Sequence, residues 1–349
     1  MGEATEKEKS GKTSSAIQGG VLDNNPDHSF AVGIASRQGS MCSGTLIAPN
    51  LVLTARHCVV PPSADEAVTC ADKFPANVAA ANLAIITEAN LFRARNYIQA
   101  KEIITPKETG FCGNDIALII LSENIPESVA KPVTPVVRFS MTDSDQLSGE
   151  ITAIGFGITS PSAEDSGYRR IKENIPLVCV PGSKTKDCKG ENAYLSDSDN
   201  EFVTAGYVCS GDSGSGAFDQ KSYEEGHPYV LGTLSRGPQT KTKCLEAIYT
   251  RTDKHADLII AAGVKAAEGG GYTAPSWVNP EAAPAPGSPE CQGETCTETS
   301  PTEPGSGAPK TTTTTTSGCS AAPGSSSSTT ALMLGVLGLG AIVARRRRR

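Results

Sequence analysis

The most informative segment of the sequence is Cys209-Ser210-Gly211-Asp212-Ser213-Gly214-Ser215-Gly216. A serine that follows Gly-Asp and precedes Gly is typical of a tight turn that exposes the hydroxyl, because glycine adopts backbone conformations that other residues disfavour. A serine hydroxyl becomes an effective nucleophile when an imidazole takes its proton, and the imidazole needs a partner that fixes its tautomer. The segment therefore predicts a nucleophilic Ser213, provided that the chain supplies a histidine and an acid.

Two other segments supply candidates for these partners. His57 lies in Leu53-Thr54-Ala55-Arg56-His57-Cys58, and Asp115 lies in Gly113-Asn114-Asp115-Ile116-Ala117-Leu118. Each motif alone is weak, because a lone Gly-Asp-Ser-Gly is more often an ordinary loop and a lone histidine is often a core residue. In the order His, Asp, Ser, however, the motifs Thr-Ala-x-His-Cys, Asp-Ile-Ala-Leu and Gly-Asp-Ser-Gly together resemble the trypsin/chymotrypsin family of serine proteases. The resemblance covers about residues 17–267.

This resemblance implies an all-β fold of two antiparallel six-stranded β-barrels, with the active site between them and a short helix at the end of the domain. Apolar strand patterns occur at 30–34, 44–47 and 51–54. The apolar run after Asp115 is typical of a buried strand. All-β barrel proteins often reach ~200–250 residues as one domain, so the chain length accommodates the fold. Residues 254–267 are expected to form the closing helix, with Leu258, Ile259 and Val264 as its apolar positions.

The resemblance also implies a role for each residue of the predicted site. His57 would take the proton of the Ser213 hydroxyl as the oxygen attacks a peptide carbonyl, and would then return it to the leaving amine. Asp115 would orient His57 and stabilise the imidazolium, and the backbone N–H groups of Gly211 and Ser213 would hold the oxyanion. This chemistry needs no metal and no organic cofactor. The expected partners are protein or peptide substrates.

Four residues are expected to shape substrate binding. In the resembled family the floor of the specificity pocket lies six residues before the nucleophile, which is Tyr207 here. Trypsin-like members carry an aspartate at that position to pair with Arg or Lys of the substrate, so this chain is not expected to prefer basic residues. Tyr207 could fill the depth of the pocket, whereas Gly237 leaves its entrance open. Ser235, Arg236 and Gly237 belong to a strand that would pair with the substrate backbone, and Arg236 stands where an aromatic residue is usual.

The segment Ala16-Ile17-Gln18-Gly19-Gly20 resembles the mature amino terminus Ile-Val-Gly-Gly of that family, with Gln18 in place of valine. In the family, a freed isoleucine amine pairs with the aspartate just before the nucleophile. Ile17 and Asp212 are therefore the expected activation pair, and residues 1–16 would be an amino-terminal extension or propeptide. A flexible lead-in to the first strand explains the segment equally well.

The chain has eleven cysteines, which favours an oxidising compartment. Four disulfides are expected: Cys42–Cys58, Cys209–Cys244, Cys179–Cys188 and Cys70–Cys112. The first two match bridges of the resembled family, beside the histidine and beside the nucleophile. The third would close a loop that flanks the substrate site, and the fourth follows by elimination.

Charge argues against nucleic acid as a partner. The net charge is −7, and five of the 31 basic residues form the C-terminal run 345–349, whereas phosphate binding needs a basic face. The short acidic run at 196–201 admits two interpretations, a calcium loop and a solvated surface loop. We favour the second, because the strict spacing of a known calcium loop is absent. A monomer without a metal site is expected.

The C-terminal residues differ in composition from the rest of the chain. Residues 268–318 are rich in Pro, Thr, Ser and Gly and are interpreted as a disordered linker. Residues 319–349 contain Cys319, an apolar segment at 331–344 and five arginines, an order that resembles a myxobacterial surface-sorting signal. In such signals the cysteine is the expected point of processing and lipid attachment. The apolar segment, expected to be a helix, is short against the ~20 residues that span a bilayer, although terminal arginines can snorkel.

The sequence as a whole predicts a serine endopeptidase that is anchored at the cell surface or released from it. No secretory signal is visible in residues 1–11, yet the cysteines and the tail favour a secreted, cell-surface or outer-membrane protein of a bacterium, with the tail reaching the membrane. One alternative is a catalytically inactive binding module that keeps the protease fold, against which the complete triad argues. Another is a surface adhesin, which only the Thr-rich linker supports.

Overall fold

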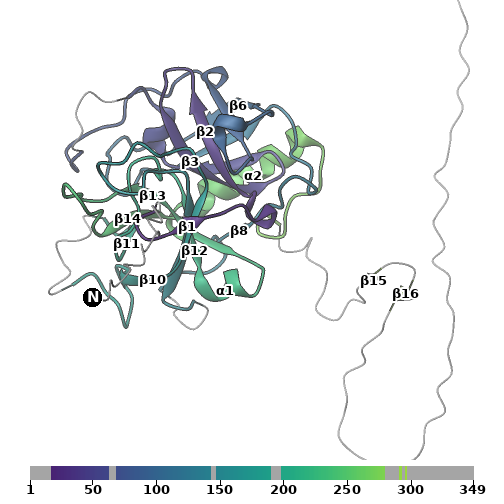
Figure 1. Ribbon diagram of the computed structural model, residues 1–349. Helices are drawn as coiled ribbons and strands as arrows, with labels where there is room; N and C mark the ends of the chain where they lie inside the picture. Colours follow the sequence, from purple (N-terminus) through teal and green to yellow (C-terminus); the bar gives the residue numbers. More distant parts are fainter. Residues whose placement is uncertain are drawn as a thin grey trace, which may run out of the picture. The chain divides into compact units, whose positions relative to one another are not determined.

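The computed structural model of the chain describes residues 17–62, 68–142, 147–189 and 198–279, and the backbone of residues 291–292 and 295–296 (Figure 1). The chain divides into two units, 1–288 and 289–349. Two β-barrels make up the described part of the first unit. The predicted amino-terminal extension, most of the predicted linker and the predicted sorting tail with Cys319 lie outside the described residues.

The first barrel closes its strands in the order β2, β3, β4, β7, β6, β5. These strands are β2 (Ala31–Ser36), β3 (Met41–Ala48), β4 (Leu51–Thr54), β5 (Leu83–Ile86), β6 (Ile98–Ile104) and β7 (Ala117–Leu121). β4 and β7 are buried along their whole length, as their apolar sequences predict. Their antiparallel register pairs Thr54 with Ala117. His57, just after β4, and Asp115, just before β7, therefore lie at the same edge of the barrel.

The second barrel contains β9 (Glu150–Gly155), β10 (Arg170–Cys179), β11 (Glu201–Thr204), β12 (Gly216–Asp219), β13 (Tyr229–Arg236) and β14 (Ala247–Arg251). The strand order is β10, β11, β14, β13, β12, β9, and β9 also pairs with β10, which closes the path. β1 (Val21–Leu22) adds to β10, and β8 (Thr134–Pro135) pairs with β13 in parallel. The expected all-β fold of two closed six-stranded barrels is confirmed.

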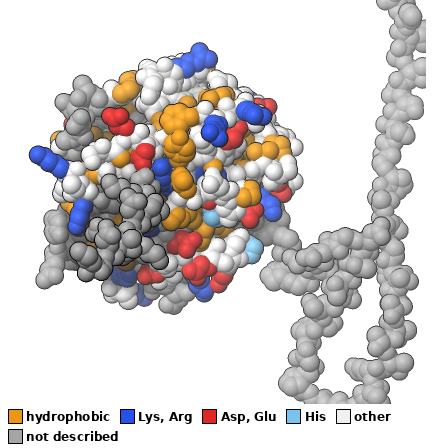
Figure 2. Space-filling view, viewed as in Figure 1, with side chains coloured by type: hydrophobic (Ala, Val, Ile, Leu, Met, Phe, Trp, Pro, Cys, Tyr) orange, Lys and Arg blue, Asp and Glu red, His pale blue; other side chains and the backbone are white. Residues whose placement is uncertain are grey.

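Each barrel has an apolar interior of its own. Leu46, Leu53 and Ile119 are fully buried in the first barrel, and Phe202 stacks on Tyr249 in the second at a ring separation of 5.2 Å. Burial of such side chains contributes about 1.5–3 kcal/mol each. On the visible outer face, basic and acidic side chains are interspersed (Figure 2). The described residues visible on this face therefore form no extended basic surface of the kind that binds nucleic acid.

The helices of the described residues are short, with one exception. They are η1 (Pro26–His28), η2 (Arg56–Val59), η3 (Ala80–Asn82), η4 (Leu91–Arg93), α1 (Gln220–Glu224), η7 (Asp253–His255) and α2 (Ala256–Gly270). α2 is the expected closing helix and packs against the first barrel at β3, β4 and β7 (Figure 1). It buries Ile259 together with Ala262 and Ala266, whereas Val264 is 40% exposed. The helix is thus confirmed, but its buried face consists mostly of small residues, which allow close approach to the barrel.

The packed part of the chain continues beyond residue 267, where the protease domain was expected to end. Trp277 and Val278 are buried against α2, and a Cβ at Gly263 would lie 2.5 Å from a methyl carbon of Val278. Arg138 Nε donates a hydrogen bond of 2.7 Å to the carbonyl of Trp277. The Gly- and Pro-rich sequence of this segment does not indicate its packing, because a few scattered apolar residues make the contacts, including Tyr272 and Ala274 beside Trp277 and Val278.

The second unit contains one described hairpin, β15 (Cys291–Gln292) and β16 (Thr295–Cys296), which pairs residue 291 with residue 296. Within the described parts of both units, no helix has the length and apolar character needed to cross a membrane. The predicted apolar helix at 331–344 lies outside these residues.

Candidate active site

His57 and Asp115 form a hydrogen-bonded pair. Asp115 is fully buried and lies two residues before β7, and His57 lies in η2. The Nδ1 atom of His57 lies 2.8 Å from Oδ2 of Asp115, and the backbone N–H of His57 donates to Oδ1 at 2.9 Å. These two contacts with the Asp115 carboxylate fix both the backbone at His57 and the orientation of its imidazole ring. With Nδ1–H donating to Asp115, Nε2 is the ring nitrogen that can accept a proton.

A third contact completes the surroundings of this carboxylate. Ser235 Oγ, near the end of β13, donates to Asp115 Oδ2 at 2.6 Å. Burial opposes ionisation of Asp115, but the charge of His57 and the hydrogen bonds from His57 and Ser235 outweigh burial and hold the pKa of Asp115 below its usual 3.8. Burial also disfavours a charged imidazole, yet Asp115 outweighs it and raises the pKa of His57 above 6.5. His57 is therefore a stronger base than a free histidine.

Ser213 lies on the turn between β11 and β12. The turn uses two glycines with positive φ, Gly211 at +92° and Gly214 at +80°. A Cβ at Gly214 would lie only 2.1 Å from Thr54 Oγ1, so a larger residue there would push the turn away from the first barrel. The glycines of the motif are thus required both by backbone conformation and by close packing.

Ser43 of β3 joins the nucleophile turn to the first barrel, a contact that the sequence motifs did not reveal. Its backbone N–H donates to the carbonyl of Ser213 at 2.8 Å, and its hydroxyl donates to the carbonyl of Gly211 at 3.0 Å. Thr54 Oγ1 donates to the carbonyl of Ser43 at 2.8 Å. These bonds hold Ser213 close to the strand that leads to His57. In the sequence, the one feature that singles out Ser43 is that it directly follows Cys42.

Asp212 and Ile17 are both fully buried in the second barrel. The Asp212 carboxylate accepts hydrogen bonds from the backbone N–H groups of Gly157 at 2.8 Å and Cys209 at 3.0 Å. Burial raises the pKa of Asp212 to about 7, and the two hydrogen bonds and the charge of Arg170 offset this only in part. Among the described residues, no ion pair to Asp212 is found. Ile17 packs in the apolar cluster of the second barrel, and Asp212 is buried close to Gly155 and Gly157 at the end of β9.

The predicted nucleophile and base share one cleft of about 670 Å³. Its walls include His57, Ser213, Val208, Leu234, Ser235, Arg236, Gly237, Phe74 and Phe111. Ser235, Arg236 and Gly237, the residues expected to pair with the substrate backbone, are among those that line this cleft. The structure thus brings together residues from both barrels that are more than 150 positions apart in the chain.

Tyr207 differs from the expectation that it could fill the depth of the pocket. Its φ is +106°, its side chain is partly exposed, and its ring lies 4.4 Å from the ammonium of Lys172. The walls of the cleft at this point come instead from Val208 and Leu234. The unusual backbone conformation of Tyr207 turns its side chain aside, and no sequence pattern signals a positive φ at a tyrosine.

All four expected disulfides are present: Cys42–Cys58, Cys70–Cys112, Cys179–Cys188 and Cys209–Cys244. Cys42–Cys58 ties β3 to the histidine turn, and Cys70–Cys112 ties a loop at the rim of the cleft to the segment before Asp115. Proteins with such bonds fold in an oxidising compartment. The acidic run at 196–201 is described from residue 198, and its Glu201 carboxylate is bound by Arg236 and by the N–H of Gly113, which leaves little capacity for calcium.

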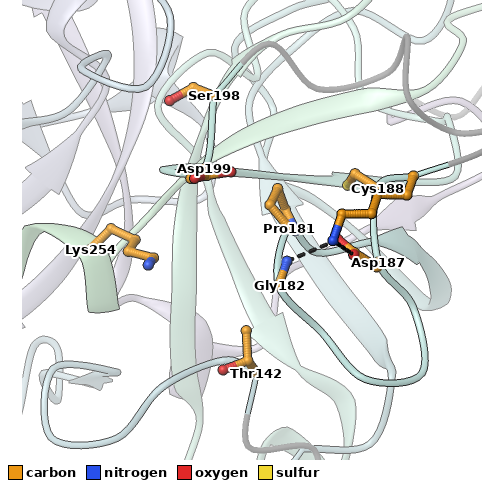
Figure 3. Close-up of a pocket in the computed structure, with 9 residues that line it drawn as sticks. Thr142, Pro181, Gly182, Asp187, Cys188, Ser198, Asp199 and Lys254 are labelled. Atoms are coloured by element: carbon orange, nitrogen blue, oxygen red, sulfur yellow. Dashed lines mark hydrogen bonds and ion pairs between the residues drawn. The ribbon is translucent and has the colours of Figure 1, made fainter.

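A second pocket has a volume of about 700 Å³ (Figure 3). Asp187 and Cys188 lie on one side of it, and Asp199 and Lys254 come from other segments. Asp187 accepts a hydrogen bond from the N–H of Gly182 at 2.9 Å, and Lys189 forms an ion pair with it at 2.7 Å. Asp187 is thus bonded to neighbouring residues of the wall, and the pocket contains none of the predicted catalytic residues.

Two closed barrels with a His–Asp pair and a serine on a glycine turn in one cleft define the two-barrel class of serine proteases. The sequence profile of the family described as Trypsin matches residues 17–259. The chain belongs to the trypsin family and contains a trypsin-like serine protease domain.

Two relatives with known names are similar to this chain. "Phenoloxidase-activating factor 3" of Holotrichia diomphalia is 28% identical over 229 residues, which are 62% of this chain and 62% of that protein. "Trypsin" of Saccharopolyspora erythraea is 26% identical over 253 residues, which are 70% of this chain and 96% of that protein. The match therefore spans less than two thirds of the Holotrichia diomphalia protein but nearly all of the Saccharopolyspora erythraea protein.

Proposed function

We propose that the protein is a serine endopeptidase whose triad is His57, Asp115 and Ser213. The observation that carries the proposal is the buried Asp115 carboxylate bonded to Nδ1 of His57 at 2.8 Å, in one cleft with Ser213. Nε2 of His57 accepts the hydroxyl proton while Oγ of Ser213 bonds to the substrate carbonyl carbon. The imidazolium then protonates the leaving amine as the C–N bond breaks. Water then attacks the carbonyl carbon of the acyl-enzyme while His57 takes a proton from it. The bond between this carbon and Oγ of Ser213 breaks as His57 returns the proton to Oγ.

The oxyanion of each tetrahedral intermediate is held by the backbone N–H groups of Gly211 and Ser213. The positive φ of Gly211 supports this role, because it turns the peptide between residues 210 and 211 away from a regular conformation. Such donors contribute about 3–4 kcal/mol of transition-state stabilisation each in other enzymes. The hydrogen bond from Ser43 to the carbonyl of Gly211 stabilises this geometry of the turn.

Activation is proposed to depend on cleavage after Ala16. The freed amine of Ile17 would pair with Asp212, whose buried carboxylate has two N–H donors but no ion-pair partner among the described residues. A buried charge without a counter-charge is costly, so the new amine would order the turn that carries Gly211 and Ser213. The position of Ile17 in the interior of the same barrel supports this step.

We also propose that the protein acts outside the cytoplasm, as a monomer that is secreted or held at a bacterial cell surface through Cys319. The four disulfides support an oxidising location. The sorting function of residues 319–349 rests on their sequence alone, that is, on the order of cysteine, apolar segment and arginines.

The triad is tested by hydrolysis of denatured casein and a peptide library, comparing the mature protein with Ser213→Ala. Ser210→Ala is a matched control, because Ser210 is an exposed serine on the same turn and lines the same cleft. We expect Ser213→Ala to abolish hydrolysis and Ser210→Ala to retain most of it. A folded, correctly processed protein without activity would instead favour the binding module or the adhesin.

A further inference from the structure

We propose that Glu201 and Arg236 are a positioning pair that holds the Asp115 loop of the first barrel in its catalytic place. The inference rests on the proposed protease function and adds two residues to its machinery. Neither residue touches the reacting atoms. Their effect would pass through the two supports of Asp115, Gly113 and Ser235.

The pair itself is well defined. Glu201 is the first residue of β11 and is fully buried, and Arg236 is the last residue of β13 and is 15% exposed. Nη1 of Arg236 lies 2.6 Å from Oε1 of Glu201, and Nη2 lies 3.0 Å from Oε2. Two parallel N–H···O bonds fix the planes of both groups as well as their separation. The pair is therefore a rigid anchor rather than a mobile surface contact.

Glu201 extends this anchor to the first barrel. Its Oε1 also accepts the backbone N–H of Gly113 at 2.8 Å, and the carbonyl of Gly113 accepts a bond from Nε2 of His255 at 2.8 Å. Gly113 has φ of +76°, and a Cβ there would lie 2.1 Å from Ser198 Oγ. Both polar groups of one glycine are thus held by side chains from the second half of the chain, two residues before Asp115.

Arg236 adjoins Ser235, the second support of Asp115. It follows Ser235, whose hydroxyl donates to Asp115 at 2.6 Å, and its guanidinium lies 5.8 Å from the ring centre of Phe111 in the loop before Gly113. The ion pair therefore lies between the serine that binds the Asp115 carboxylate and the glycine that positions its backbone. If the pair is broken, both supports can shift, and with them the orientation of His57.

The two residues differ in one respect that the test can use. Arg236 lines the substrate cleft, whereas Glu201 is fully buried behind it. A change at Glu201 should therefore affect kcat more than KM. Asp23→Asn is a matched control, because Asp23 is also a buried acid that forms an ion pair with an arginine, Arg169, at 2.9 Å, and its bonded partners do not touch Gly113 or the triad.

The first experiment compares Glu201→Gln and Asp23→Asn with the wild-type mature enzyme. We expect Glu201→Gln to lower kcat by about tenfold with KM nearly unchanged, since small misplacements of catalytic groups have effects of this size. We expect the acid limb of the kcat/KM profile to move to lower pH, because a displaced Asp115 supports the imidazolium less well. Asp23→Asn should lower the melting temperature without moving kcat or the limb. If Glu201→Gln lowers only the melting temperature, the pair is merely structural and the proposal fails.

A second experiment does not depend on turnover. The pKa of His57 is measured by NMR in a Ser213→Ala background, with and without Glu201→Gln, and we expect a lower pKa in the latter. If Glu201→Gln does not fold, Arg236→Lys keeps the charge but loses the two-point contact, and the same direction of change is expected at smaller size. An unchanged pKa of His57 would overturn the positioning role. A wild-type protein without hydrolytic activity would instead overturn the proposed function, whatever the NMR result.

Discussion

The buried Asp212 gives the uncut chain a pH dependence that cleavage after Ala16 should remove. The perturbation that isolates it is Asp212→Asn, made in a Ser213→Ala background so that the protein cannot cut itself. The substitution removes the charge and keeps the size of the side chain. It also loses one of the two backbone N–H bonds of the carboxylate, from Gly157 or Cys209, but that cost does not vary with pH.

The magnitude follows from the pKa of Asp212, about 7 in the fold against 3.8 ordinarily. A raised pKa means that the folded chain binds this proton more tightly than the unfolded chain does. The stabilisation that this proton gives to the folded chain is therefore complete below about pH 4 and is lost as the pH rises through 7. At 1.4 kcal/mol per pKa unit, the loss is about 4 kcal/mol. Asp115 and Asp23, whose pKa values are lowered, act in the opposite sense, since their stabilisation is lost as the pH falls.

The assay is urea unfolding at pH 4, 6 and 8. In the uncut chain, we expect the free energy of unfolding of Asp212→Asn to rise relative to its parent by about 4 kcal/mol between pH 4 and pH 8. The other carboxyl groups are present in both proteins, so their contributions cancel in the difference between the two free energies of unfolding. In a chain that begins at Ile17, the amine supplies a counter-charge to Asp212. The difference in free energy of unfolding should then be nearly independent of pH or change with pH in the opposite direction.

Two results would refute this reasoning. A difference that does not vary with pH in the uncut chain would show that Asp212 is not buried without a counter-charge before cleavage. The same slope in the uncut and cut forms would show that Ile17 is not its partner.

The other predictions concern the triad, the specificity pocket and the tail. His57→Ala and Ser213→Ala should each remove nearly all turnover, and the double variant should be little worse, since triad members act as a unit; additive losses in steady-state kinetics would contradict this. Peptide-library profiling should show apolar residues preferred over Arg and Lys before the cut, because Val208 and Leu234 line the cleft where Tyr207 does not; a sharp basic preference would count against it. Intact-mass analysis of protein from its native membrane should find Cys319 modified and residues 345–349 missing, and a retained Arg349 with an unmodified Cys319 would leave only a plain apolar tail.

Much of the fold could be predicted from the sequence because its signals are local. The apolar sequences of β4 and β7 predict their burial directly. Two of the four disulfides match bridges of the resembled family, Cys179–Cys188 follows from the short loop that it closes, and Cys70–Cys112 follows by elimination. The His57–Asp115 contact also follows, since both residues flank neighbouring strands. These features depend on residue type and order, which a sequence displays directly.

The remaining features depend on contacts between distant segments. The turn of Tyr207 away from the cleft requires a positive φ that no motif marks, and the bonds of Ser43 to the nucleophile turn join residues about 170 positions apart. Glu201 was counted within a solvated acidic run, whereas the fold buries it against Arg236. Of the three apolar positions expected in α2, Ile259 is buried but Val264 is 40% exposed, and alanines that a sequence pattern does not single out complete the buried face.

The central claim is that Ser213 is a nucleophile activated by His57, and covalent labelling tests it most directly. The mature protein is treated with a fluorophosphonate, digested, and the modified residue is identified by mass spectrometry. We predict a single adduct on Ser213, retained in Ser210→Ala and lost in His57→Ala. A folded, mature protein that remains unlabelled, or an adduct on another serine, would contradict the account.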